Sequence, residues 1–124
     1  MVQNDESYDD DNIFARILAG TIPARLLFEN EHALAFADIN PQAPVHILVI
    51  PKGRYVSMAD FAASAPDTLV AGFWRAVGEV ARAQGLEPGG YRLLVNAGPD
   101  SHQEVPHLHV HILAGKPLGP LLTR

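Results

Sequence analysis

A stretch of seven residues near the end of the chain, His-Leu-His-Val-His-Ile-Leu at positions 107–113, constrains fold and function more than any other. Its strict alternation of polar and apolar residues predicts a half-buried strand, because successive side chains of a strand point to opposite faces. The apolar residues would face a core, and His107, His109 and His111 would line the other face together. An ordinary solvated strand face mixes Thr, Lys, Glu and Ser. A row of imidazoles, which titrate near neutrality, indicates proton transfer, nucleophilic attack or metal binding instead.

Zinc binding is one interpretation of this row. At a rise of about 3.3 Å per residue, His107 and His111 start roughly 13 Å apart along a strand. A zinc ion binds nitrogen at about 2.1 Å, so these two cannot easily share one ion. His107 and His109 could share one, but further ligands would have to come from elsewhere, and the chain has no Cys. A purely structural histidine ladder is a second alternative. Catalysis is favoured over both, with zinc possible and no cofactor expected to be required.

The composition is that of a single globular domain. The chain has 124 residues, of which 48% are hydrophobic, and no apolar run comes near the roughly 18 residues of a membrane span. The first residues lack the basic and apolar regions of a signal peptide. The absence of Cys excludes a disulfide framework and fits a reducing compartment. We therefore expect a cytoplasmic enzyme with no membrane contact.

The formal net charge of −5 comes from the start of the chain. Five acidic residues lie within the first eleven positions, and the remaining nine balance the nine Lys and Arg. Residues 1–11 are therefore expected to form a disordered acidic tail, followed by a single domain over residues 12–124. No basic stripe is present, so no nucleic-acid partner is expected.

Local patterns predict an α+β fold. Strands are expected at 25–29, 33–37, 45–52, 91–96 and over the histidine stretch, with helices at 13–19 and 66–84 and one helical turn at 58–63. The strands cluster as antiparallel neighbours and the helices are kept apart, which is typical of the α+β class.

Two segments carry a resemblance to a known family. The histidine stretch resembles the His-φ-His-φ-His-φ-φ motif, with φ apolar, of the histidine triad nucleotide hydrolases and transferases. Residues 38–52, Asp-Ile-Asn-Pro-Gln-Ala-Pro-Val-His-Ile-Leu-Val-Ile-Pro-Lys, are very similar to the corresponding segment of the Hint branch of that family. The closing Lys-Pro-Leu-Gly-Pro-Leu-Leu at 116–122 looks most like the bacterial Hint members. The resemblance extends over roughly residues 12–122.

This resemblance implies a fold and an activity. The fold is a five-stranded antiparallel sheet with one long and one short helix, and two subunits pair as a homodimer into one ten-stranded sheet. The activity is cleavage of the P–N bond of purine nucleoside 5′-phosphoramidates through a covalent nucleotidyl-histidine. His109 would be the nucleophile, and the main-chain carbonyl of His107 would accept the proton on its other nitrogen. His111 would protonate the leaving group. His46 would order the triad.

The resemblance also implies a purine nucleoside monophosphate, or its amide or anhydride derivatives, as the ligand. Asp38 would bind both ribose hydroxyls, although an Asx-turn role is the structural alternative. Asn96 would lie beside the phosphate and leaving group. Main-chain N–H groups of a loop would bind the phosphate oxygens, and apolar side chains would enclose the base. The loop residues are Gln103, Glu104 and Val105, and the base pocket comprises Ile13, Phe14, Ile17, Phe36 and Ile39.

Three positions depart from the family pattern. His102 stands where Gly is usual, and His is one of the few other residues enriched at positive φ. Pro106 replaces a commonly aromatic residue, and Glu104 replaces a Ser of many animal members. These changes bear on substrate preference more than on the chemistry.

Two other functions stay open at this point. The same histidine could hydrolyse diadenosine polyphosphates or other dinucleotides, although the Pro-Gln-Ala-Pro segment and the closing residues argue against it. The protein could also be a non-catalytic module that binds a nucleotide or a protein partner.

Overall fold

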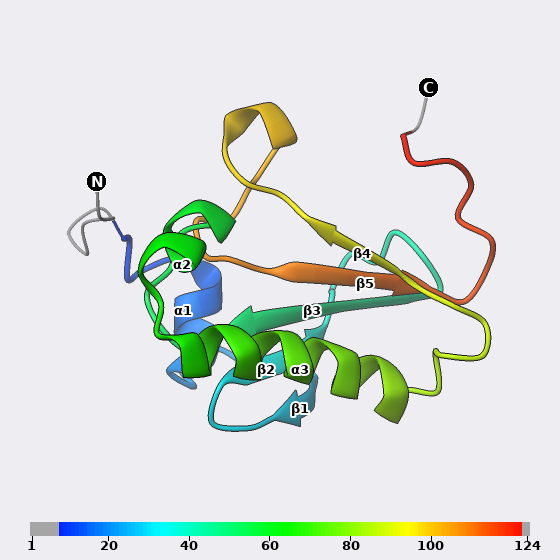
Figure 1. The fold of residues 1–124 in the computed structure, drawn as a ribbon, viewed down its shortest axis with the longest axis horizontal. Helices are drawn as coiled ribbons and strands as arrows, with labels where there is room; N and C mark the ends of the chain where they lie inside the picture. Colours follow the sequence, from blue (N-terminus) through cyan, green and yellow to red (C-terminus); the bar gives the residue numbers. More distant parts are fainter. Residues whose placement is uncertain (1–7, 123–124) are drawn as a thin grey trace.

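The computed structural model describes residues 8–122 and shows one antiparallel sheet flanked by helices (Figure 1). The strands are β1 (Leu26–Glu29), β2 (Ala33–Ala37), β3 (Val45–Pro51), β4 (Arg92–Val95) and β5 (Val110–Ala114). The helices are α1 (Ile13–Leu18), α2 (Met58–Ser64) and α3 (Asp67–Ala83), with a 3₁₀ turn, η2, at Pro99–Ser101. The strand order is β1-β2-β3-β5-β4, and each neighbouring pair is antiparallel. The predicted α+β class and five-stranded antiparallel sheet are confirmed.

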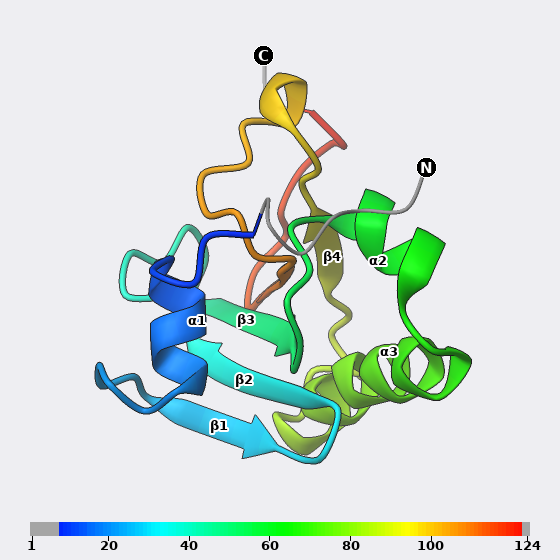
Figure 2. The ribbon, with the colours of Figure 1, turned by 90° about the vertical axis from the view of Figure 1, so that its left-hand side faces the viewer.

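The two faces of the sheet carry different layers (Figure 2). On one face, Phe73, Val77 and Val80 of α3 pack against alternate strand residues, among them Val49 and Val110. On the opposite face, a smaller cluster forms between α1 and the sheet. It comprises Phe14, Leu34, Phe36, Leu48 and Ile50. The period of two along β2 and β3 thus supplies apolar side chains to both layers, so both faces of these central strands are buried.

The short helices begin where the sequence provides a cap. The Asn12 side chain accepts a hydrogen bond from the Ala15 N–H at 2.9 Å and starts α1, as predicted. At the start of α2, Ser57 and Asp60 form a reciprocal capping box. The resemblance implied one short helix, whereas the described residues contain two, since the expected turn at 58–63 extends to seven residues.

The histidine stretch is only partly a strand. Strand β5 begins at Val110, because the preceding N–H groups bond elsewhere: His107 donates to the Val105 carbonyl and Leu108 to the Tyr55 carbonyl. The expected strand over 107–113 is therefore wrong at its beginning. The alternation nevertheless holds, since Leu108, Val110 and Ile112 are all fully buried in the core beneath α3.

The described part of the chain begins at residue 8, ahead of the expected boundary between tail and domain at residue 12. Residues 1–7 lie outside the described residues, so the predicted disorder there stays a prediction. Tyr8, however, is buried, and Asp10 pairs with Arg54. No helix in the described part of the chain is long and apolar enough to span a membrane.

Candidate active site

A cavity of about 380 Å³ opens between α1 and the sheet and collects most of the predicted site residues. Its walls are mainly apolar, with histidine and carboxylate side chains on one side. The predicted site residues among its lining are Ile13, Phe14, Ile17, Phe36, Asp38, Ile39, Glu104, Val105, His109 and His111. All five residues expected to form the base pocket therefore line one cavity. Ile39, with 93% of its surface exposed, lies at the rim.

The ring of Phe14 connects α1 to the histidines. It lies edge-on to Phe36, at 5.4 Å between ring centroids, and edge-on to His109 at 4.9 Å. Asn12 caps the helix and Phe14 is the buried residue of its apolar face, so the capping signal directly positions an aromatic wall beside the central imidazole.

One ring nitrogen of His109 makes a hydrogen bond to the main chain. Its Nδ1 lies 2.7 Å from the main-chain carbonyl oxygen of His107. A carbonyl oxygen only accepts, so the proton resides on Nδ1 and the lone pair on Nε2. The residue is buried yet lines the cavity, which gives an unprotonated nitrogen access to a ligand. This arrangement suits nucleophilic attack.

His107 does not line the cavity. It is fully buried, with Nε2 at 3.1 Å from the Pro51 carbonyl oxygen and Nδ1 at 2.5 Å from the Tyr8 hydroxyl. The sequence pattern predicted that the three triad side chains line one face together, and this prediction is wrong for His107. His107 belongs to the interior, and His109 and His111 face the cavity.

His46, His111 and Asp38 form a second hydrogen-bonded group. The Gln42 N–H donates to His46 Nδ1 at 2.9 Å, so the proton of His46 resides on Nε2. That nitrogen lies 2.9 Å from His111 Nδ1 and 3.3 Å from an Asp38 oxygen. Because His111 Nδ1 accepts the hydrogen bond from His46 Nε2–H, the proton of neutral His111 resides on Nε2. His111 Nε2 is buried and has no hydrogen-bond partner within residues 8–122.

Burial keeps these imidazoles neutral. It lowers the pKa of His107 to about 4, and it lowers the pKa of His111 to about 4 with help from neighbouring His109 and His46. It also lowers the pKa of His109, against the opposing effects of the His107 carbonyl, Asp38 and Glu104. The pKa of His46 is lowered by burial and raised in part by Asp38. An unprotonated His109 is therefore the dominant form near neutrality.

The side chains closest to a metal-binding arrangement differ from those considered from the sequence. Both ring nitrogens of His107 are engaged, so His107 and His109 cannot share an ion. Asp38, His46 and His111 instead bring one ligand atom each within 4.8 Å of one another. The hydrogen bonds among them account for this proximity without an ion.

The loop between β4 and β5 uses Gln103 as an internal brace. Its side-chain amide donates to the Val56 and Val105 carbonyls at 2.7 and 3.0 Å and accepts from the Gly98 N–H at 2.9 Å. Its own main-chain N–H donates to the Gly98 carbonyl at 3.3 Å. The predicted phosphate contact from Gln103 is therefore not supported by this geometry, whereas Glu104 and Val105 both line the cavity.

Two further predicted positions are not part of the cavity wall. His102 adopts φ 66° and ψ 41°, and it is the only non-glycine residue with positive φ among residues 8–122. The loop thus keeps the left-handed conformation expected where the family has Gly. Asn96 directly follows β4, and the pairing of Val95 with Val110 places it alongside His109, although it is not part of the cavity wall.

Tyr8 was missed by reasoning from the sequence. It lies in the expected tail, and its contact with His107 spans 99 residues of chain. The available signal was a single aromatic residue within an acidic run, close before the N-cap of a helix.

Comparisons with known proteins show the family of the chain. The family model described as HIT domain matches residues 19–118. A 13.2 kDa HIT-like protein of Azospirillum brasilense is 60% identical over 119 residues, covering 96% of this chain and 98% of the relative. The purine nucleoside phosphoramidase of Escherichia coli K12 is 36% identical over 114 residues, covering 92% and 95%.

Solved structures are similar over most of their length. A histidine triad protein from Clostridium difficile matches with a TM-score of 0.81 and 41% identity, covering 92% of this chain and 98% of that one. A HIT family hydrolase from Legionella pneumophila matches with a TM-score of 0.78 and 39% identity, covering 86% and 95%.

Proposed function

Since this chain belongs to the HIT domain family and is a HIT family hydrolase, we propose that it cleaves the P–N bond of purine nucleoside 5′-phosphoramidates. The observation that carries the proposal is the setting of His109. Its Nδ1 proton is fixed on the His107 carbonyl, and its Nε2 lone pair is available inside a ligand-sized cavity. The relative named as a purine nucleoside phosphoramidase supports this choice of substrate.

In the proposed first step, His109 Nε2 attacks the α-phosphorus and the bond between phosphorus and the amine nitrogen breaks. The product is a nucleotidyl-histidine whose imidazole carries a positive charge. The Nδ1–H hydrogen bond to the His107 carbonyl stabilises that charge, because charge-assisted hydrogen bonds are stronger than neutral ones. A preorganised acceptor of this kind lowers the barrier of the step.

The leaving amine takes its proton from His111. The negative charge of a bound phosphoramidate favours the protonated form of a neighbouring imidazole, although burial disfavours that form in the empty site. In the second step water attacks the nucleotidyl-histidine and gives its proton to His111. The bond between phosphorus and His109 then breaks, which releases the nucleoside monophosphate and restores both histidines. Before substrate binds, His46 orients the neutral His111 through their 2.9 Å hydrogen bond.

The rest of the cavity matches a nucleotide. The apolar wall provided by α1 and β2 suits a flat purine, and Asp38, which lines the same cavity, is the proposed acceptor for two ribose hydroxyls. Asp38 also makes an Asx-type bond to the Asn40 N–H at 2.8 Å through Oδ1, which leaves Oδ2 directed toward His46. The main-chain N–H groups of Glu104 and Val105 are the proposed donors to the phosphate.

We also propose that the protein is a homodimer in which two copies of β4 lie side by side. Strand β4 is at an edge of the sheet. It exposes Leu93 and Leu94 on opposite faces, since Leu93 pairs with Ile112 and Leu94 with His111. A second sheet paired with this edge would cover both side chains and would provide hydrogen-bond partners for the unpaired main-chain groups of the edge strand.

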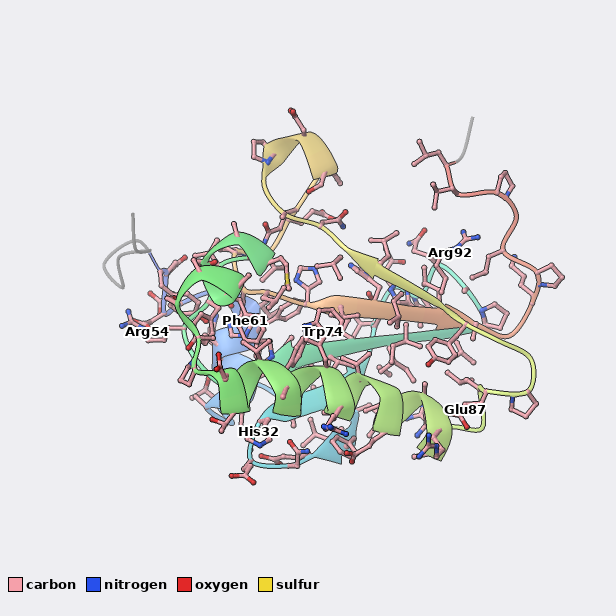
Figure 3. The ribbon with its side chains drawn as sticks, viewed as in Figure 1. His32, Arg54, Phe61, Trp74, Glu87 and Arg92 are labelled. Atoms are coloured by element: carbon pink, nitrogen blue, oxygen red, sulfur yellow. The ribbon has the colours of Figure 1, made fainter. Side chains whose placement is uncertain are left out.

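Release of AMP from adenosine 5′-phosphoramidate by the purified protein tests the catalytic proposal. His109→Ala should lower the turnover number by at least about a thousandfold, because the covalent route is lost. His32→Gln is the matched control, since His32 lies by α3 outside the cavity (Figure 3). Intact protein that binds AMP but releases none would overturn the proposal. Release of AMP from diadenosine tetraphosphate alone would point to the dinucleotide hydrolases instead.

A further inference from the structure

The residues immediately before α1 are held by hydrogen bonds and an ion pair next to the buried His107. We name the segment Tyr8–Asp11 the N-terminal strap. Tyr8 is only 6% exposed, and the carboxylate of Asp10 bonds Arg54 Nε and Nη2 at 2.9 and 3.0 Å. The Arg54 guanidinium also lies 5.3 Å from the centroid of the Tyr8 ring, at the end of the molecule where the chain begins (Figure 3). The Asp9 carbonyl accepts from the Asn12 side chain and main chain, which joins the strap to α1.

The hydrogen bonds of His107 define which partner donates to it. The Pro51 carbonyl can only accept, so the His107 proton is on Nε2, which faces it. His107 Nδ1 must then accept, and the Tyr8 hydroxyl must donate, across a distance of 2.5 Å. Burial raises the pKa of Tyr8 and lowers the pKa of His107 to about 4, so both groups are neutral near pH 7 and this assignment holds. The Pro51 carbonyl thereby selects the tautomer of this fully buried imidazole, and the Tyr8 hydroxyl hydrogen-bonds its remaining nitrogen.

The main chain of the same histidine binds the proposed nucleophile. The His107 carbonyl accepts from His109 Nδ1 at 2.7 Å. The ring of His107 is held at both nitrogens, by Tyr8 on one side and Pro51 on the other, so it cannot rotate freely. Two consecutive hydrogen bonds therefore run from Tyr8 through His107 to His109.

We infer that Tyr8 is a positioning residue for catalysis: its hydroxyl fixes the orientation of His107, whose carbonyl directs His109 toward the substrate. The inference rests on the proposed function for its catalytic consequence. It assigns the N-terminal strap a role in the reaction, although Tyr8 does not line the cavity and does not touch the substrate. The alternative is that Tyr8 only fills space, since its ring also packs edge-on to His107 at 5.7 Å.

The Tyr8→Phe variant separates these roles because it keeps the ring and removes only the hydroxyl. We expect its turnover number for adenosine 5′-phosphoramidate to fall roughly tenfold, as for the loss of one buried hydrogen bond, with KM changed less than about twofold. Tyr91→Phe is the matched control, since Tyr91 is an exposed tyrosine at the start of β4. Tyr8→Ala removes ring and hydroxyl together, and the melting temperature of each variant shows that it is folded under the assay conditions.

Long-range ¹H–¹⁵N spectra of the histidine rings give a second measurement that does not depend on turnover. In the parent protein, His107 should appear as the Nε2–H tautomer with a hydrogen-bonded Nδ1. In Tyr8→Phe the Nδ1 resonance should move toward the value of an unbonded nitrogen. A Tyr8→Phe variant with the parent turnover number and spectrum would overturn the inference, particularly if only Tyr8→Ala lost activity. Failure of the parent protein to release AMP would instead defeat the proposed function, while the spectra would still test the hydrogen bond.

Discussion

At the scale of single residues, burial decides how the histidines respond to pH. His109 must be neutral to attack phosphorus, and burial lowers its pKa below the usual 6.5. A lower pKa means that His109 stays unprotonated as the pH falls through 6.5. We therefore predict that kcat/KM for adenosine 5′-phosphoramidate does not fall as the pH is lowered from about 8 to 6.5, and that its acidic loss lies below pH 6.5. A requirement for protonated His111 would also prevent a fall of kcat/KM over this range, because the protonated fraction of His111 rises as the pH is lowered. A pH–rate profile measures this.

The charged neighbours of His109 provide the control for the pH profile. Asp38 and Glu104 both raise the pKa of His109, in opposition to burial. Glu104→Gln removes one of these negative charges while keeping the size of the side chain. The acidic loss of activity should then stay in place or move to lower pH, and only slightly, because Glu104 is largely exposed to solvent. A loss centred above pH 6.5 in the parent, or a shift to higher pH in Glu104→Gln, would contradict the assignment of His109 as a buried neutral nucleophile.

Some residue roles followed from local chemistry, and others did not. The left-handed conformation of His102 followed from the Gly that the family has at that position. The five apolar residues of the base pocket came from the resemblance and all line the cavity. Tyr8 and the brace formed by Gln103 could not be predicted. Each works through hydrogen bonds to residues far away in the chain, such as His107 and Val56, and no local pattern encodes such a pairing.

At the scale of secondary structure, α3 contains two glycines with opposite surroundings. A Cβ atom at Gly72 would overlap the imidazole of His32, which lies on the turn between β1 and β2 (Figure 3). A Cβ atom at Gly78 would meet nothing within 4 Å. Gly72→Ala should therefore lower the free energy of unfolding by about 1–3 kcal/mol through overpacking. Gly78→Ala should raise it by about 0.5–1 kcal/mol, because Ala is the better helix former. Chemical denaturation measures both.

A double variant tests the physical reason for the Gly72 effect. If the destabilisation by Gly72→Ala comes from overlap with the His32 ring, the same substitution should lower the free energy of unfolding much less when it is introduced into the His32→Ala variant than into the parent protein. Additive losses would show that the helix backbone, and not His32, is responsible. An equal loss in Gly78→Ala would exclude a local steric cause.

The boundaries of elements followed the sequence where side chains set them. Asn12 caps α1 and the apolar spacing of α3 places Phe73 and Val77 in the core, as predicted. The late start of β5 was not predictable, since it depends on the Leu108 N–H reaching the Tyr55 carbonyl more than fifty positions earlier in the chain. The alternating pattern correctly predicted that Leu108, Val110 and Ile112 are buried in the core, but it predicted neither the burial of His107 nor which backbone groups pair within the sheet.

At the scale of the whole molecule, the five-stranded antiparallel sheet came from the resemblance to a family, and the order of its strands was not predicted. Alternation defines the faces of a strand, but it does not specify which strand lies next to it. The order β1-β2-β3-β5-β4 leaves β1 and β4 at the two edges, and each edge exposes leucine. The sequence pattern alone treats the two edges alike, so the choice of β4 for dimer formation must be tested on the assembled protein.

The proposed dimer makes a different prediction for each edge. Leu94→Lys places a charge on β4, where it opposes pairing of a second sheet, because edge lysines prevent strand association. Leu26→Lys is the matched control on the exposed residue of β1. In analytical ultracentrifugation at micromolar concentration, the parent and Leu26→Lys should sediment as twice the 13.4 kDa chain, and Leu94→Lys as the single chain.

A monomeric parent would refute the dimer. Dissociation of Leu26→Lys alone would move the interface to β1. If Leu94→Lys is monomeric yet still releases AMP at the parent rate, each subunit carries a complete site.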